Sequence, residues 1–510
     1  MSRIEGMRRL LASSIGATCA AALALPLTQP AAATPAPAAR TSPAAGAAAI
    51  AGRAAAASGG VAGGTQSLPL EPLARDRSLG PAAEQGLPRR RVRRFSLVGV
   101  VWDDPDAALH GTVQVRARAT ATGAWSGWQD VEPDNADHGA DPGSAERASG
   151  RVRGGTAPLW VGDSDGVQVR VRAEGGTGGT GGTGGDAPSR LPSGLRVELV
   201  DPGRAAPADG TGRAEGTDRA AGADRAGAAP AGPVGRDTPD QVAGQPEAVP
   251  GAVPAALGSR ARAASAANTE LAGVALGATE IPALDRQQTE RELLALPGTG
   301  LTEQQRAKPY IGPRPGIVTR RGWGADEKLR ESKFRYTNTV KAAFVHHTVT
   351  GNAYSCSQAP AVIRSIYRYH VKSLGWRDIG YNFLVDKCGK IYEGRAGGVA
   401  KPVMGAHTYG FNTDSMGVAV LGTFTSAKPS SAAVKAIAQL TAWKLGLYGR
   451  NPSAKTYLKS GGGNLYKKGK EVRLNVISGH RDGYATECPG RYLYGKLDST
   501  RSTAARYQGR

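Results

Sequence analysis

Regularly spaced apolar residues occur in only two stretches of this chain, at about residues 94–202 and 314–510. Elsewhere the sequence is rich in alanine, glycine and proline; the 510 residues include 71 glycines and 33 prolines, and only 5% are aromatic. A segment folds compactly only where it buries enough apolar surface to offset its loss of conformational entropy. We therefore expect two folded domains, joined and preceded by segments without a packed core.

The first 33 residues have the pattern of a secretory signal peptide. An arginine-containing start is followed by an apolar run from Leu10 to about Leu27, and then by the small residues Ala31 to Ala33. No later stretch is long and apolar enough to span a bilayer, so no stable membrane anchor is expected. The pair Arg8-Arg9 fits a twin-arginine signal only loosely, which leaves the export route (Sec or Tat) open.

The four cysteines are informative because thiols outside the cytoplasm are usually paired or bound to a ligand. Cys19 would leave with the signal peptide, and three cysteines remain. Cys356 opens a predicted helix and Cys388 lies in a predicted turn, so a disulfide between these two loop-end positions is the easiest pairing. Cys488 is then left over, as a thiolate available to a metal ion.

Positive charge is concentrated in the C-terminal stretch. From Arg314 to the end there are 32 lysines and arginines but only 11 aspartates and glutamates, an excess of 21 that equals the net charge of the whole chain. A basic exported domain favours a polyanionic partner, and outside the cell this means anionic wall polymers sooner than nucleic acid. The alternative is that the charge serves solubility alone.

Residues 94–202 contain short runs in which apolar and polar residues alternate, such as "GTVQVRARAT". This period of two, with intervening glycine, aspartate and proline, predicts a small antiparallel all-β domain. Its tryptophans are expected in the core, although they could instead form a sugar-binding platform; they are Trp102, Trp125, Trp128 and Trp160. The run GGTGGTGGTGG at residues 175–185 is predicted to be a flexible inserted loop.

The segments on either side of this domain are predicted to lack a core. Residues 34–93 are Ala/Gly/Pro-rich and expected to be disordered, and residues 203–313 are expected to form a low-complexity linker. Within the linker, the patch "DRQQTERELLALPG" is compatible with a short helix, to which we assign no function.

In residues 314–510 predicted strands alternate with predicted helices, which indicates an α/β domain with a mixed sheet flanked by helices. The strands are expected at "KAAFVHHTV", in a hairpin at "YNFLVDKCGKIYEGR", at "SMGVAVLGTF" and at "RLNVISGH". The helices are expected at "SQAPAVIRSIYRYHVKSLG", "SSAAVKAIAQLTAWKLGLYG" and "RYLYGKLDSTRSTAARY". His370 shares a helical spacing with Ile363 and Ile366, so it is predicted to be a core histidine.

A metal site is predicted from three side chains that are far apart in the sequence. His480 and Cys488 lie eight positions apart, and zinc in hydrolases takes three protein ligands and keeps a fourth position for water. The strand end "FVHHT" supplies a third candidate; since neighbouring strand residues point to opposite faces, only one of His346 and His347 can face the site. The alternative is a surface His480 and an inert buried Cys488.

Five ordered blocks of sequence resemble the peptidoglycan recognition protein family, whose fold also serves phage-type zinc amidases related to T7 lysozyme. The blocks are "RRGWGA", "FVHHT", "GWRDIGYNFLVDKCGKIYEGR", "GAHTYGFNTDSMGVAVLG" and "GHRDGYATECPG". The resemblance covers about residues 314–490 and none of the N-terminal half.

The resemblance implies Zn²⁺ bound by His346, His480 and Cys488, with Tyr381 and Thr486 as catalytic residues. It implies hydrolysis of the amide between the muramoyl lactyl group and L-alanine of peptidoglycan by a secreted, wall-associated enzyme. Family members that only recognise wall fragments typically lack the zinc cysteine. Its presence here favours an N-acetylmuramoyl-L-alanine amidase.

Substrate contacts are expected from Arg395, His407 and Asn412. The loop that lines the peptide groove in the family reads AGGVAKPVM here and lacks the usual aromatic residue, so the choice between diaminopimelate and lysine stems stays open. No carboxylate base is expected, because Glu393 lies at the far end of the hairpin and Glu487 should point away from Cys488.

Two other functions are compatible with the sequence. The chain could be a module that binds peptidoglycan without cutting it, or a structural wall protein that adheres through the charge of its basic domain. The partner expected in every case is peptidoglycan, with anionic wall polymers as a second one and with no nucleic acid.

Overall fold

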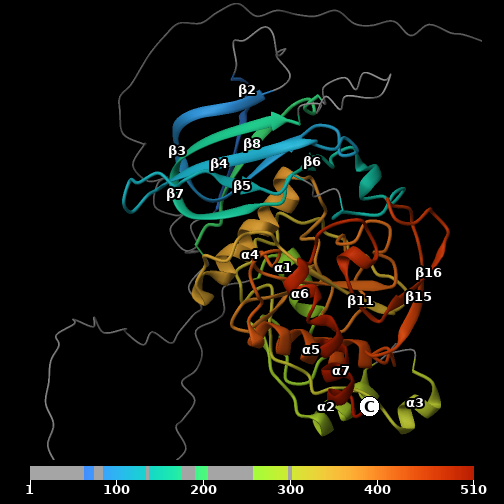
Figure 1. Cartoon of the computed structure of the whole chain (residues 1–510). Coiled ribbons are helices and arrows are strands. Elements are labelled where there is room, and N and C mark those ends of the chain that lie inside the picture. The colour runs from blue at the N-terminus through green and yellow to red at the C-terminus, as the bar shows by residue number, and fades with distance from the viewer. Residues whose placement is uncertain (1–62, 74–83, 134–136, 175–189, 205–256, 297–300) are drawn as a thin grey trace, which may run out of the picture. The chain divides into compact units, whose positions relative to one another are not determined.

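The computed structural model describes residues 63–73, 84–133, 137–174, 190–204, 257–296 and 301–510. The predicted signal peptide (residues 1–33) and the Gly-Gly-Thr run (residues 175–185) lie outside these described residues. Figure 1 shows an antiparallel sheet in blue to green and an α/β region in yellow to red. Within the described ranges, no helix has the length and apolar character needed to cross a membrane.

The first region is an all-β sheet of eight strands, as predicted, in the order β1-β8-β3-β7-β4-β5 with β2 and β6 paired to β3. Its alternation is clear in β4, where Val113 and Val115 are buried while Gln114 and Arg116 are partly exposed. The strands are β1 (Gly64–Pro69), β2 (Glu71–Pro72), β3 (Glu84–Trp102), β4 (Gly111–Ala119), β5 (Gln129–Val131), β6 (Gly154–Gly155), β7 (Leu159–Ala173) and β8 (Arg196–Asp201).

The sheet begins earlier in the chain than predicted. Disorder was expected over residues 34–93, which is wrong for β1, β2 and the first half of β3. Leu70 and Leu87 are buried in the core of this sheet. The first half of β3 is difficult to predict from the sequence, because it contains an arginine-rich run whose side chains are exposed. One of these residues, Arg91, pairs with Asp165 at 2.9 Å. The remainder of residues 34–93 lies outside the described residues.

Only one of the four tryptophans expected in the core lies there. Trp102 is buried, whereas Trp125, Trp128 and Trp160 are only partly buried. The guanidinium of Arg170 lies 4.0 Å from the ring centroid of Trp128, so an arginine covers this aromatic face in place of apolar neighbours. Trp125 and Trp128 lie in the connection between β4 and β5, each beside an arginine, so the core prediction is wrong for them; Trp160 of β7 packs against a core cluster and is only partly buried.

The second sheet is mixed and has seven strands, in the order β17-β11-β14-β12-β13-β10-β9. β11 runs parallel to both β14 and β17, and β12 pairs with β14 in parallel and with β13 as the predicted hairpin. The α/β prediction is therefore confirmed. The strands are β9 (Glu280–Ile281), β10 (Ile317–Val318), β11 (Ala342–His347), β12 (Phe383–Val385), β13 (Ile391–Glu393), β14 (Ser415–Val420) and β17 (Ile477–Gly479).

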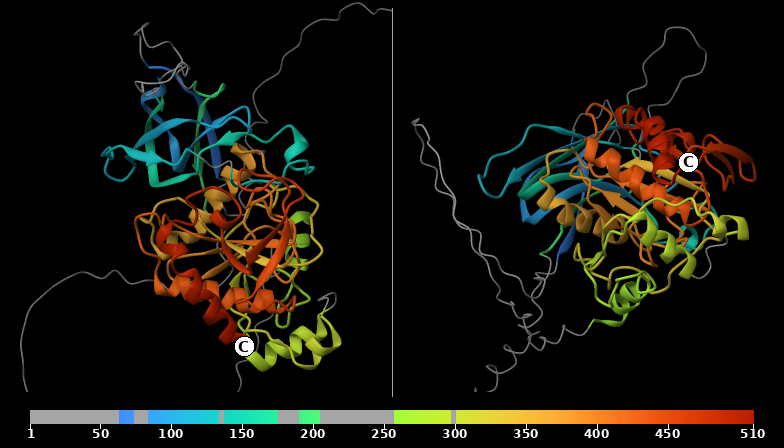
Figure 2. Two further views of the ribbon diagram at one scale, coloured as in Figure 1. Left: turned by 45° about the vertical axis from the view of Figure 1, so that its right-hand side comes forward. Right: turned by 90° about the horizontal axis from the view of Figure 1, so that it is seen from below.

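Helices cover both faces of this sheet, so its strands are buried on both sides. Val418 of β14 packs with helix α5 (Ser431–Gly446), and its neighbour Ala419 packs with helix α4 (Ala359–Arg368) on the opposite face. Figure 2 shows α5 beside the C-terminal helix α7 (Leu497–Tyr507). His370, in the turn that follows α4, is buried and accepts a hydrogen bond from the Gly380 N–H, as expected of a core histidine.

Part of the predicted linker is folded. Residues 257–296 and 301–313 contain helices α1 (Ser259–Ala266), α2 (Arg286–Ala295) and α3 (Glu303–Ala307). Leu271, Ile281 and Leu293 are buried against the second sheet, where β9 extends its edge. A few large apolar residues therefore suffice to fold this segment, because it packs onto an existing core and does not form one of its own. The remainder of residues 203–313 lies outside the described residues, except for the end of β8's loop at 203–204.

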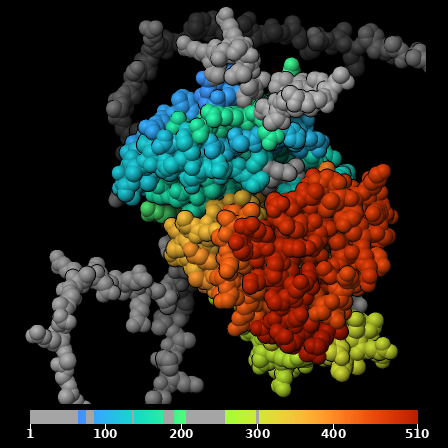
Figure 3. Space-filling model, in the orientation of Figure 1, coloured from blue at the N-terminus to red at the C-terminus, as the bar shows by residue number. Residues whose placement is uncertain are grey.

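The remaining elements complete the C-terminal region. A two-stranded ribbon joins β15 (Lys455–Lys459) and β16 (Glu471–Asn475), and the short helix α6 (Arg491–Tyr494) precedes α7. The space-filling view in Figure 3 shows the C-terminal residues, in red, at the surface. The predicted disulfide between Cys356 and Cys388 is present, with Cα atoms 6.2 Å apart.

Candidate metal centre

The parallel strands β11 and β17 bring two histidines together. Their register places Val345 opposite Gly479, so His346 and His480 follow at neighbouring positions where both strands end. Both imidazoles are fully buried, and their ring centroids lie 4.5 Å apart. Carboxyl ends of parallel strands commonly form ligand sites, because loops leave the sheet there.

Cys488 reaches the same point from the loop after β17. Its Sγ lies 3.8 Å from His346 Nδ1, and it is the free cysteine among the described residues. The loop is held by a hydrogen bond from the Arg481 N–H to the Cys488 carbonyl and by one from the Cys488 N–H to Thr486 Oγ1. The three side chains expected to bind a metal therefore converge.

His347 points to the other face of the sheet. Its Nδ1 accepts a hydrogen bond from the Phe424 N–H at 3.2 Å. Val345, two residues earlier, packs in the core beneath α5, on the face that His347 shares. The alternation of β11 thus selects His346 for the site, as predicted.

The hydrogen bonds of the imidazoles leave one nitrogen of each ring for a metal ion. His480 Nε2 lies 3.1 Å from the Asp137 carbonyl, so this nitrogen is the N–H donor and Nδ1 carries a lone pair. That Nδ1 is buried and has no hydrogen-bond partner. The Nε2 of His346 lies 3.3 Å from His407 Nδ1, so the Nδ1 of His346 is left to face Cys488. Two imidazoles and one thiolate form a donor set that suits zinc.

Burial keeps these ligands uncharged. It lowers the pKa of His346 well below its usual range and the pKa of His480 to about 3, and it raises the pKa of the Cys488 thiol well above its usual range. Neutral imidazoles are the form that binds metals, and a bound cation would stabilise the thiolate. The buried apolar surroundings are therefore compatible with a metal centre, and they disfavour protonation of the histidines.

A third histidine, from the first sheet region, also enters the site and is not predicted from the sequence. His138 is buried, and its ring centroid lies 4.6 Å from that of His480. Together with His346, His480 and Cys488 it offers four ligand atoms that all lie within 4.8 Å of one another. The only signal in the sequence was a histidine in the segment "DHGADPG", which has no metal-ligand spacing.

Tyr381 and Thr486 lie beside this cluster. Tyr381 precedes β12, is buried, and its ring centroid lies 5.6 Å from that of His346. Burial and the neighbouring Cys488 raise the pKa of Tyr381 well above its usual range, so its hydroxyl stays protonated and can donate. Thr486 is half-buried, and its side chain forms a hydrogen bond with Asp137.

The three expected groove residues are buried and engaged by neighbours. Arg395 forms two hydrogen bonds with the carboxylate of Glu146, at 3.0 and 3.1 Å. The side-chain amide of Asn412 donates to Asp141 Oδ1 at 2.6 Å. His407 contacts His346, as described above, so it lies next to the cluster.

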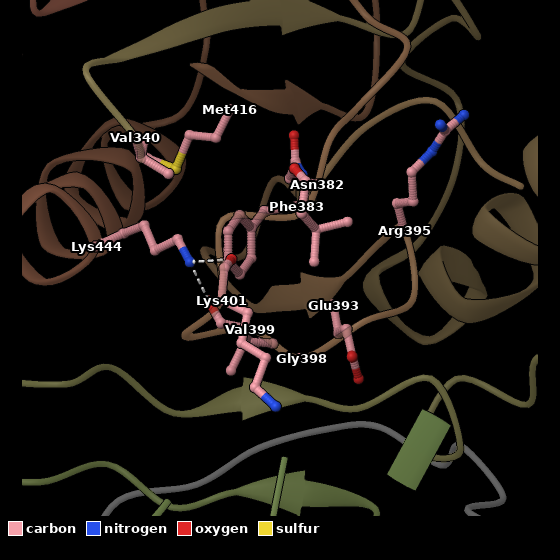
Figure 4. Close-up of a pocket in the computed structure, with 11 residues that line it drawn as sticks. Val340, Asn382, Phe383, Glu393, Arg395, Gly398, Val399, Lys401, Met416 and Lys444 are labelled. Carbon is pink, nitrogen blue, oxygen red and sulfur yellow. Dashed lines mark hydrogen bonds between the residues drawn. The ribbon is translucent and has the colours of Figure 1, made fainter. Parts of the chain in front are cut away.

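The loop expected to line the groove, residues 396–404, is held by hydrogen bonds on its α5 side. Figure 4 shows Lys444 of α5 donating from Nζ to the carbonyls of Val399 and Lys401, at 2.6 and 2.7 Å. Burial lowers the pKa of Lys444 well below its usual range. The amide of Asn268, in the segment predicted to be linker, accepts from the Val399 N–H at 2.8 Å. The hollow beside Lys444, on the α5 side of the loop, contains none of the metal-ligand candidates. The residues around it support the loop.

Neither nearby glutamate faces the cluster, as expected. Glu393 accepts hydrogen bonds from the side chain of Asn268 and from the Arg320 N–H. Glu487 is exposed and pairs with Arg481 at 3.0 Å.

Comparisons with known proteins match both regions of the chain. A family model described as N-acetylmuramoyl-L-alanine amidase matches residues 336–491, which include His346, His480 and Cys488. Peptidoglycan-recognition protein SC2 of Drosophila melanogaster is 33% identical over 183 residues, covering 36% of this chain and 84% of that protein. The chain belongs to the peptidoglycan recognition protein and amidase family. A relative from Trichoplusia ni, named peptidoglycan recognition protein, is 30% identical over 183 residues, covering 36% of this chain and 85% of that protein.

The similarity to this family is confined to the C-terminal part of the chain. The solved structure of Drosophila PGRP-LB is 25% identical and covers 36% of this chain and 92% of that one, with a TM-score of 0.29. The first region matches a different family model, described as Rv3811 N-terminal galactose-binding domain-like, over residues 33–194. His138 lies in this second match, so the four-residue cluster combines residues of two families.

Proposed function

We propose that the protein is a secreted, zinc-dependent N-acetylmuramoyl-L-alanine amidase that hydrolyses the amide between the muramoyl lactyl group and L-alanine of peptidoglycan. The observation that carries this proposal is the buried convergence of His346, His480 and Cys488, in which His346 Nδ1 contacts the thiol and His480 Nδ1 has no hydrogen-bond partner. Zn²⁺ bound there would supply a water of lowered pKa and would polarise the amide carbonyl.

The protein's own residues have distinct tasks in this reaction. The hydrogen bond from His480 Nε2 to the Asp137 carbonyl orients the imidazole, as partners of metal ligands generally do. Tyr381 would donate its hydroxyl proton in a hydrogen bond to the carbonyl oxygen as negative charge develops there. Thr486 would orient the loop that carries Cys488. Water adds to the carbonyl carbon, the C–N bond breaks, and the amine of L-alanine leaves with a proton.

Substrate binding is proposed for the buried donors beside the cluster. Arg395 is bonded through its N–H to the Tyr381 carbonyl and Asn412 accepts from the His407 N–H, and the side chains of both already bind carboxylate oxygens of the chain itself. A stem peptide offers carboxylates and carbonyls that would suit the same donors. The basic charge of the region from Arg314 onward would favour attachment to anionic wall polymers as well.

The proposal is tested with purified wall peptidoglycan, with and without a chelator, by assaying new L-alanine amino termini. We expect release that stops with the chelator, returns with zinc, and is abolished in Cys488→Ser while wall binding is kept. Release that ignores the chelator would reject zinc chemistry.

The second candidate function is peptidoglycan binding without hydrolysis. The names of the relatives, which are recognition proteins, favour it. In that case Cys488→Ser would change neither wall binding nor the composition of the wall.

A further inference from the structure

A segment of the first region, Asp137–Glu146, lies across the metal centre; we call it the inserted segment. It joins the first sheet region to the site, and its residues hydrogen-bond to the C-terminal region along their length. The Asp137 carbonyl accepts hydrogen bonds from the Tyr409 N–H and from His480 Nε2. Asp137 and His138 are both buried. The beginning of the inserted segment is therefore part of the interior of the site.

The His138 imidazole is prepared to bind a metal ion. Its Nδ1 lies 2.6 Å from Asp137 Oδ1, and a carboxylate can only accept, so Nδ1 carries the proton. The other nitrogen, Nε2, is buried without a hydrogen-bond partner. A carboxylate that holds one ring nitrogen while the other faces the metal is a common arrangement for ligand histidines. Asp137 thus selects the tautomer of His138 that binding requires.

We propose that His138 is a fourth protein ligand of the metal, and that the inserted segment thereby holds the enzyme in a closed state of low activity. This inference rests on the proposed function. A catalytic zinc site keeps one position open for water or substrate, whereas a site with four protein ligands is closed. His480, His346, Cys488 and His138 would together supply four protein ligands, since their four ligand atoms lie within 4.8 Å of one another.

The far end of the inserted segment occupies the donors that we assign to substrate. Glu146 is buried and binds Arg395 through both of its carboxylate oxygens, and the Arg377 N–H donates to the same carboxylate. Asp141 Oδ1 accepts from the Asn412 amide and from the Gly410 N–H. Two carboxylates of the chain therefore take the places that acidic groups of a stem peptide would need.

The first region, which carries the inserted segment, packs against the C-terminal region. Tyr369 donates its hydroxyl to the Thr156 carbonyl at 2.9 Å, and Ser373 donates to Glu198 Oε2 at 2.9 Å. Leu97 of β3 packs in one core cluster with Ile366 of α4. Because these contacts fix the first region against α4, the closed state does not depend on the His138 contact alone.

The test uses the full chain, its His138→Ala variant and His110→Ala as the matched control, since His110 is an exposed histidine of the same region. Each protein is loaded with cobalt(II), and azide is added while the visible spectrum is followed. An open metal position binds azide and shifts the bands. We expect no shift in the parent chain or in His110→Ala, and a saturable shift in His138→Ala at one metal ion per chain.

Amidase rates of the zinc forms provide the second measurement. We expect His138→Ala to release L-alanine amino termini at least ten-fold faster than the parent. Glu146→Ala, which frees Arg395 without touching a metal ligand, should also raise the rate and serves if His138→Ala does not fold. A parent spectrum that azide shifts like that of His138→Ala, or a measurable parent rate that is equal or lower in both variants, would overturn the inference.

The two proposals fail in different ways. If azide binds only to His138→Ala and no form cleaves the wall, His138 is a ligand and the amidase proposal fails. If every form cleaves at one rate and azide shifts every spectrum, the amidase proposal stands and the closed state is rejected.

Discussion

The adjacent residues His346 and His347 point to opposite faces of β11: His346 Nδ1 lies 3.8 Å from Cys488 Sγ, whereas His347 Nδ1 accepts from the Phe424 N–H at 3.2 Å. Replacing each with alanine should therefore have different effects. His346→Ala should lose the metal and all hydrolysis. His347→Ala should keep the metal and lose about 1–3 kcal/mol of stability, because the buried Phe424 N–H is left unpaired.

Metal content by mass spectrometry and unfolding midpoints check this pair, and each variant is the control of the other. Loss of the metal in His347→Ala, or its retention at full stoichiometry in His346→Ala, would contradict the assignment of faces.

Tyr381→Phe should lower the hydrolysis rate by about 10²–10³, as removal of an oxyanion donor does, and leave the metal content unchanged. The reason is that burial keeps the Tyr381 hydroxyl protonated beside the cluster. Rates are compared in one background, His138→Ala, in which the site is expected to be open. An unchanged rate would remove Tyr381 from the mechanism.

Removal of the disulfide should destabilise the C-terminal region and leave the metal centre intact. Cys356 and Cys388 are 32 positions apart, and a closed loop of this length contributes about 3–4 kcal/mol through the entropy of the unfolded chain. The double variant Cys356→Ala/Cys388→Ala should unfold at lower denaturant concentration with one metal ion still bound. Equal midpoints for variant and parent would contradict this expectation.

Glu393 should make stability depend on pH. Burial raises the pKa of Glu393 from 4.5 to about 7, against the lowering effect of its hydrogen bond from Asn268. A carboxyl group whose pKa is higher in the folded state contributes fully below the unfolded pKa, near 4.5, and that stability is lost as the pH rises through about 7. The difference corresponds to roughly 3 kcal/mol.

Glu393→Gln removes this titration and is the matched variant. Between pH 4.5 and 7.5, the unfolding free energy of the parent should fall relative to that of Glu393→Gln, as measured by denaturant titration. A parent that gains stability relative to Glu393→Gln over this range would show that the pKa is lowered.

Features carried by local pattern could be predicted from the sequence. The alternation in β11, the leftover Cys488 and the turn at Cys388 each constrain their own neighbourhood, and the structure brings His346, His480 and Cys488 together as expected. The arginine-rich start of β3 was missed because exposed charges on a sheet face mask its period of two.

Contacts between distant segments could not be predicted. His138 precedes His346 by about two hundred positions, and no spacing rule links a loop of one domain to the strand ends of another. The helices at residues 257–313 were missed for a related reason: Leu271 and Leu293 have few apolar neighbours in sequence and become buried only against the second sheet.

The proposed reaction is hydrolysis of the lactyl–L-alanine amide with a metal held by His346, His480 and Cys488. Mass analysis of a defined muropeptide, incubated with zinc-loaded His138→Ala, tests it most directly. We expect two fragments, a sugar with a free lactyl carboxyl group and a stem peptide that begins with L-alanine, and neither after chelation or in Cys488→Ser of the same background. An intact muropeptide, cleavage at another bond, or fragments that form equally without the metal would contradict it.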